Sequence, residues 1–193
     1  MTVLDRRAAR VVLVDGTDRT LLLRGGDPAR PGLRWWFTPG GGLHGDETPA
    51  EGAARELFEE TGLRVAPEDL GEPFWHQVTQ FSYDNQKYRQ EQDFYLVRVP
   101  EWQIDTTGFD PEERLTIDDH RWWSAAELDV TAETVYPENL AELLRQIVAT
   151  RPSPSLAPPR SSPSLAAPAA LPSPAPSPSP RPFSAGPSGP RVG

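Results

Sequence analysis

Residues 41–63 read GGLHGDETPAEGAARELFEETGL, and this stretch decides the fold class. It holds the start and stop signals of one helix. Thr48 is a good N-cap, Pro49 suits the first helical position, and Glu51 completes a capping box. Gly62 can adopt the left-handed conformation that ends a helix. These signals predict a helix between Thr48 and Gly62.

Three carboxylates of this helix have spacings that place them on one face. Glu56, Glu59 and Glu60 are related as i, i+3 and i+4, so they share one helical turn. Like charges so placed repel one another, and an acidic helix face is often simply solvated. A hard divalent cation reverses that repulsion, because Mg²⁺ takes oxygen ligands and is usually held by one or two carboxylates together with substrate phosphates. Arg55 is the local counter-charge.

The spacing around the helix is the most specific signal in the chain. Gly41 is followed after five residues by Glu47, and seven residues later by the run 55–63. Over residues 41–63 the pattern resembles the full Nudix box, with every specified position filled. The resemblance covers about residues 8–148.

The resemblance implies a fold and a reaction. Nudix proteins have an α/β/α sandwich with a mixed sheet, in which the box forms a loop–helix–loop. Most hydrolyse a nucleoside diphosphate linked to another group, splitting a pyrophosphate bond with Mg²⁺ or Mn²⁺ and an activated water. The implied substrate is a small nucleotide-type molecule, and a homodimer is one implied arrangement because many members dimerise. A box-bearing relative, isopentenyl diphosphate isomerase, depends on a catalytic Cys, and this chain has none.

The resemblance also implies roles for single residues. The expected catalytic residues are Glu59, Glu56 and Arg55. The expected metal ligands are Glu56, Glu59, Glu60 and the backbone carbonyl of Gly40. Arg55 is expected to orient the glutamates. Gly41 and Glu47 are the expected supporting residues, and Glu47 supports either the loop or a metal.

The rest of the body reads as strands and two further helices. Short apolar or β-branched runs predict strands at 8–14, 20–23, 33–37, 74–83, 93–99 and 121–123, with a polar turn at 84–92. A second capping box, Ser124 with Glu127, precedes a short helix, and Pro137 is expected to open the last helix. Strands that alternate with helices favour an α/β sandwich.

Composition divides the chain at residue 150. Residues 151–193 hold 14 of the 23 Pro, four Arg and no acidic residue, so we expect a disordered tail rich in Pro, Ser and Ala. Residues 1–150, the expected Nudix domain, carry 15 basic and 28 acidic residues, a formal charge of -13. This acidity argues against a nucleic-acid polymer as partner. Without an apolar run of membrane length or a signal-peptide pattern, a cytoplasmic protein is expected.

The substrate side gives weaker signals. A nucleobase needs a stacking platform, and Arg side chains suit phosphates. The candidate substrate-binding residues are Arg34, Trp36, Phe81 and Tyr83. For the aromatic residues, sheet or core packing is the competing interpretation. Trp35 and Trp36 are adjacent in a strand and therefore face opposite ways.

Auxiliary carboxylates are a further expectation. Asp118 and Asp119 lie just before the strand at 121–123, and Glu112 and Glu113 precede them. Any of the four could assist the box glutamates, and each could equally be a surface charge.

Alternatives to this function remain open at the level of sequence. The window 78–83 lacks the Pro typical of ADP-ribose hydrolases and only imperfectly matches dinucleoside polyphosphate hydrolases. A non-catalytic Nudix domain that senses a nucleotide or sugar nucleotide is the alternative, although such modules often lose box glutamates. The tail could bind a proline-recognising partner.

Overall fold

A computed structural model describes residues 2–150. The strands are β1 (Val3–Val14), β2 (Thr20–Gly26), β3 (Arg34–Phe37), β4 (Gly40–Gly42), β5 (Trp75–Tyr83), β6 (Gln86–Arg98), β7 (Ile117–Trp123) and β8 (Val135–Tyr136). The helices are α1 (Pro49–Thr61), the 3₁₀ turn η1 (Pro67–Asp69), α2 (Glu113–Thr116), α3 (Ala125–Val130) and α4 (Leu140–Ala149).

The sheet is mixed and divides beyond its central hairpin. Its order is β5-β6-β1-β2-β3-β8, with β4 also paired to β1 and β7 to β2. β1 and β2 are in register at Val14 and Thr20, next to the turn. Further along, β1 runs between β6 and β4, whereas β2 runs between β3 and β7. The divergence leaves space between the two halves of the sheet.

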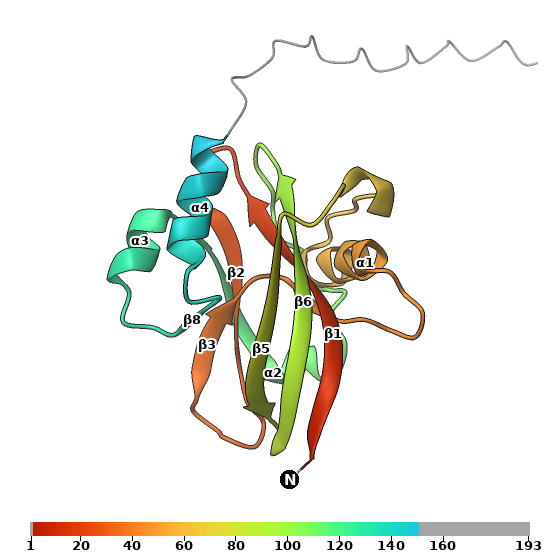
Figure 1. The fold of residues 1–193 in the computed structure, drawn as a ribbon. Coiled ribbons are helices and arrows are strands. Elements are labelled where there is room, and N and C mark those ends of the chain that lie inside the picture. The colour runs from red at the N-terminus through yellow and green to blue at the C-terminus, as the bar shows by residue number, and fades with distance from the viewer. Residues whose placement is uncertain (1, 151–193) are drawn as a thin grey trace, which may run out of the picture. The chain divides into compact units, whose positions relative to one another are not determined.

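Alternation along β1 builds a core on each face of the sheet, because successive side chains of a strand point to opposite faces. Val11 and Leu13 pack with Leu57 of α1, whereas Val12 packs with Leu144 of α4. Figure 1 shows α1 on one side of the sheet and α3 with α4 on the other. The predicted α/β/α sandwich is confirmed.

Helix α1 forms as its local signals predict. Thr48 Oγ1 accepts from the Glu51 backbone N–H, and the Glu51 carboxylate accepts from the Thr48 backbone N–H. Gly62 ends the helix with φ 72°, a conformation that costs glycine little. The buried side chains of Ala53 and Leu57 fix the helix on the sheet.

The predicted polar turn at 84–92 is wrong. The turn consists of Asp84 and Asn85, both with positive φ, and β6 starts directly after it. Two such residues match the twist of a hairpin and tolerate the left-handed region. The polar residues that follow form a strand because β1 starts at Val3, not at residue 8, and pairs with β6 from Val3 and Lys87 onward.

Two further boundaries differ from the prediction. The last helix begins at Leu140 and not at Pro137, whose carbonyl instead accepts the Leu140 N–H in a turn before the helix. The strand expected at 121–123 begins at Ile117, because β7 pairs with β2 over most of that strand's length. The Ser124–Glu127 capping box before α3 is confirmed.

The structure does not describe every residue for which the sequence makes a prediction. The predicted tail, residues 151–193, is outside the described residues, so the domain boundary and a tail partner stay predictions.

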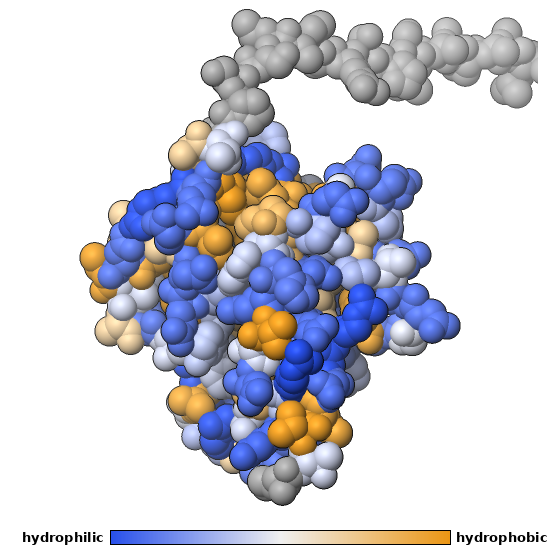
Figure 2. All heavy atoms as spheres, viewed as in Figure 1, coloured by the Kyte–Doolittle hydropathy of each residue, from blue (hydrophilic) through white to orange (hydrophobic). Residues whose placement is uncertain are grey.

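Across residues 2–150 there is no helix of the length and apolarity that crossing a bilayer requires. On the face drawn in Figure 2, hydrophilic side chains prevail and the apolar ones form scattered areas. The homodimer stays a prediction.

Candidate active site

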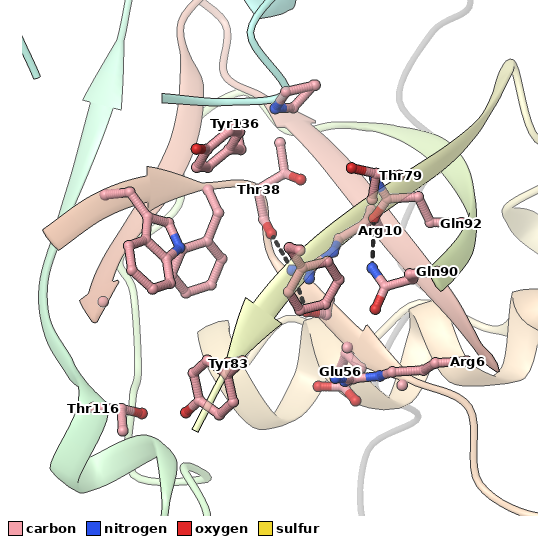
Figure 3. A pocket seen from close by; sticks show the side chains of 18 of the residues that line it. Arg6, Arg10, Thr38, Glu56, Thr79, Tyr83, Gln90, Gln92, Thr116 and Tyr136 are labelled. Atoms are coloured by element: carbon pink, nitrogen blue, oxygen red, sulfur yellow. Dashed lines mark hydrogen bonds between the residues drawn. The ribbon is translucent and has the colours of Figure 1, made fainter. Parts of the chain in front are cut away.

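A cleft of about 1230 Å³ lies where the two halves of the sheet diverge. β1, β5 and β6 line it from one half, and β3 lines it from the other. The glycines of β4 and two glutamates of α1 line one end. Figure 3 shows Arg6, Arg10, Glu56 and Gln90 together in this pocket.

Three carboxylates converge at that end of the cleft. Oxygens of Glu56 and Glu60 on α1 and of Glu113 at the start of α2 lie within 4.8 Å of one another. Glu56 is 6% and Glu60 2% exposed. Helical spacing explains the first two, whereas Glu113 reaches them only through the tertiary fold.

Backbone groups of β4 hold these carboxylates closely. The Gly40 N–H donates to Glu60 Oε2 at 2.6 Å. A Cβ at Gly41 would lie 2.6 Å from Glu56 Oε1, so any side chain there would displace the carboxylate. This close approach explains why glycine stands at the start of the motif.

Burial shapes the ionisation of the cluster. It raises the pKa of Glu60 well above the ordinary carboxyl range, and the neighbouring charge of Glu56 acts in the same direction. Burial also raises the pKa of Glu56, against the opposing effect of Arg55. The pKa of Glu113 is raised, again mainly by burial. Crowded, buried carboxylates of this kind fit a hard divalent cation, because all the donors are oxygens.

Arg55 connects the cluster to the preceding loop. Its Nη1 donates to Glu56 Oε1 at 2.8 Å and to Glu59 Oε2 at 2.9 Å. Its Nε and Nη2 donate to the two oxygens of Glu47 at 2.9 and 3.0 Å, and Nη2 also donates to the Gly42 carbonyl. The Arg55 guanidinium holds the pKa of Glu47 below its usual value. One side chain thus orients three carboxylates.

Two of the expected ligand groups have other partners here. Glu59 does not join the close cluster; its carboxylate is 40% exposed and paired with Arg55. The Gly40 carbonyl lies at the cleft but accepts from Arg10 Nη1 at 2.5 Å. Arg10 also donates to the Thr38 carbonyl, so it braces the segment that leads into β4. No sequence pattern indicates this role of Arg10, because it lies inside an apolar strand.

The expected aromatic platform is displaced by one residue. Trp36 is 2% exposed and packs in the α4-side core against Trp123, so it does not face the cleft. Trp35 lines the cleft instead, as alternation along β3 requires. The expectation for Trp36 is therefore corrected. Phe81 and Tyr83 do line the cleft.

The remaining predicted substrate residues are partly engaged. The Tyr83 hydroxyl donates to Glu112 at 3.1 Å, and burial raises the pKa of Tyr83 to about 12. Arg34 lines the cleft and pairs with Asp118 at 2.9 Å. Tyr83 and Arg34 are thus already bonded to acidic side chains, whereas Phe81 lines the cleft with its ring stacked on Tyr88.

Asp118 and Asp119 are not brought to the acidic cluster. Asp118 pairs with Arg24 and Arg34, and these two cations hold its pKa below the usual value against the effect of burial. Asp119 is half-exposed near Arg24. Both lie on β7, which pairs with β2 away from α1. Glu113, which the sequence offered as one of the four candidates, is the additional carboxylate in the cluster, so the expectation for the two aspartates is corrected.

A family model described as NUDIX domain matches residues 4–147. The chain belongs to the Nudix hydrolase family. A curated "MutT-like protein" of Streptomyces ambofaciens is 46% identical over 63 residues, which cover 33% of this chain and 36% of that protein. The chain thus spans about a third of the length of this curated relative.

Solved structures agree on the fold. A MutT/Nudix family protein of Enterococcus faecalis has a TM-score of 0.54 at 17% identity, covering 77% of this chain and 64% of that one. The MutT protein of Methanosarcina mazei Go1 has a TM-score of 0.51 at 18% identity, covering 77% of this chain and 96% of that one. A third similar structure is a bifunctional NMN adenylyltransferase/ADP ribose pyrophosphatase of Francisella tularensis, complexed with AMP and a manganese ion. Its TM-score is 0.52 at 18% identity, covering 77% of this chain and 42% of that one.

Replacing Arg55 tests its orienting role. Arg55→Lys keeps the charge but loses the planar fork that contacts three glutamates at once. We expect hydrolytic kcat/KM to fall about 10- to 100-fold, as for lost supporting contacts at metal sites. Arg7→Lys, an exposed position on β1, is the matched control and should leave kcat/KM unchanged. Equal activity of the two variants would contradict the role.

The pH dependence of stability tests the burial of Glu60. Because the folded-state pKa is raised, the unfolded state releases this proton first, and stability is lost as pH rises from the ordinary carboxyl range through the folded pKa. In EDTA, Glu60→Gln should therefore gain stability relative to wild type as pH rises. Thermal unfolding from pH 4 to 8 measures this, with the exposed Glu101→Gln as control. If the difference in thermal stability between wild type and Glu60→Gln stays constant from pH 4 to 8, the pKa of Glu60 is not raised in the folded state.

Proposed function

We propose that this chain hydrolyses a pyrophosphate bond in a nucleoside diphosphate linked to another group, in a reaction that depends on a divalent metal ion. The convergence of Glu56, Glu60 and Glu113 at one end of a large cleft is the observation that supports it. The chain carries a strongly acidic body, so a pyrophosphate would be repelled without a cation between the two sets of charges.

Glu56, Glu60 and Glu113 are the residues that would hold Mg²⁺ or Mn²⁺. The raised pKa values of their carboxyl groups reflect a cluster that is poorly stabilised by protein groups alone. When bound, such an ion neutralises phosphate charge and lowers the pKa of a coordinated water. The manganese ion bound by the Francisella protein is in line with this donor set.

Glu59 is the carboxylate to which we assign the proton of the attacking water. It lies on the same helix face as Glu56 and Glu60, is half-exposed, and is held by Arg55 at 2.9 Å. An exposed carboxylate with fixed orientation can accept a proton within hydrogen-bond reach. Arg55 positions both Glu56 and Glu59 and keeps Glu47 on the loop.

The nucleotide would lie along the cleft, with its phosphates toward the acidic end. Arg6, which forms no ion pair with any described residue, and Arg34 offer positive charge. Trp35 and Phe81 offer ring surfaces from opposite walls. The AMP in the Francisella complex is the kind of nucleotide we expect here.

A substrate panel tests the proposal. Purified protein is incubated with Mg²⁺ or Mn²⁺ and dinucleotides, nucleoside triphosphates, oxidised nucleotides or sugar nucleotides, and phosphate and nucleotide products are measured. We expect turnover of at least one class, its loss in EDTA and its recovery with added metal. Glu59→Gln and Glu56→Gln should lower kcat/KM about 10²-fold or more, whereas Glu101→Gln should not.

Two results would refute hydrolysis. Inactivity of the wild type across the panel, together with tight nucleotide binding, would indicate a sensing domain instead. Full activity of Glu56→Gln and Glu59→Gln would place the chemistry elsewhere.

A further inference from the structure

Three glutamine side chains form a chain of hydrogen bonds on the cleft face of β5 and β6. Gln90 Nε2 donates to Gln92 Oε1 at 2.8 Å, and Gln92 Nε2 donates to Gln77 Oε1 at 2.6 Å. Each amide therefore donates in the same direction along the chain. The direction leaves one acceptor over at its start, the amide oxygen of Gln90.

That oxygen has no hydrogen-bond partner among the described residues. Gln90 is 2% exposed and lines the cleft. Figure 3 shows its nitrogen joined to Gln92 and its oxygen turned away from that bond. An unpaired buried acceptor costs free energy that a donor from a ligand would recover. The Gln90 oxygen is thus suited to a ligand N–H group.

The side chains around Gln90 indicate the shape of that ligand. Tyr88 lies two residues before it on the same face of β6, and its ring stacks on Phe81 with 5.4 Å between centroids. Arg6 is the register partner of Gln90 on β1, and its guanidinium lies 6.0 Å from the Tyr88 ring centroid. Aromatic rings beside an amide suit a planar, nitrogen-bearing ring.

We propose that Gln90 Oε1 accepts a hydrogen bond from the exocyclic amino group of a nucleobase, so that the cleft prefers bases with this amino group to counterparts that lack it. An oxo group at that position would present lone pairs to the amide oxygen and leave it unpaired. Sites built to pair a substrate N–H discriminate strongly against analogues that lack it. The inference rests on the proposed function only in taking a nucleotide as the ligand.

Binding of nucleoside monophosphates tests the preference without turnover. Calorimetry with Mg²⁺ present compares AMP with IMP, GMP with IMP, and CMP with UMP. The amino-bearing member of at least one pair should bind tenfold or more tightly. A smaller difference in all three pairs, or no binding of any of the five nucleotides, overturns the proposal.

Substitution of Gln90 tests the residue itself. Gln90→Met is close in shape and lacks the acceptor, and it should reduce the preference in that pair to within twofold. Gln103→Met makes the same chemical change at an exposed position outside the cleft, and this variant should keep the wild-type preference for the amino-bearing nucleotide. Gln90→Met also removes the donor to Gln92, so Gln90→Glu serves as a second variant that keeps an oxygen in place and should retain the preference. A preference that persists in Gln90→Met, or is lost in Gln90→Glu, overturns the proposal.

The two proposals fail in different ways. A wild type that hydrolyses nucleotides but does not discriminate between the pairs refutes the role of Gln90 alone. A wild type that prefers the amino-bearing monophosphate yet hydrolyses nothing refutes the hydrolase and leaves the role of Gln90 standing.

Discussion

The guanidinium of Arg55 is the contact on which the rest of the site depends. It joins Glu47 of the loop before α1, Glu56 and Glu59 of the helix, and the Gly42 carbonyl of β4. A loop, a helix and a strand are thereby held in one arrangement by one planar group. The carboxylates that share it would otherwise repel one another and swing into solvent.

At the acidic end of the cleft, the protein groups do not compensate the repulsion among the buried carboxylates. Glu60 is buried, receives one backbone N–H from Gly40 and lies close to Glu56 and Glu113. The charge of Arg10 opposes the rise in the pKa of Glu60, but burial also disfavours the charged form of Arg10 and lowers its pKa. This arrangement of three carboxylates supports the proposal that they hold a cation between them.

Features that depend on neighbouring residues could be predicted from the sequence, whereas features that depend on contacts between distant residues could not. Helix α1, its caps and the common face of Glu56, Glu59 and Glu60 depend on contacts within one turn, so they were predictable. The strand at 86–92 was missed because its polar residues pair with β1, far away in the chain. The burial of Trp36 depends on which face of β3 packs on the core, and no local pattern carries that information. Glu113 could be named only as one of four candidate carboxylates, because its place beside α1 depends on the position of α2.

The cleft has an acidic end at α1 and an amide-lined wall on β5 and β6, and the proposed hydrolysis depends on metal binding at the acidic end. Crystals soaked in Mn²⁺ test it directly through anomalous diffraction. We predict a peak bonded to oxygens of Glu56, Glu60 and Glu113 at about 2.0–2.2 Å, as for hard cations of this size. Manganese bound elsewhere on the surface, with no peak between these three carboxylates at saturating metal, would contradict a metal site at Glu56, Glu60 and Glu113.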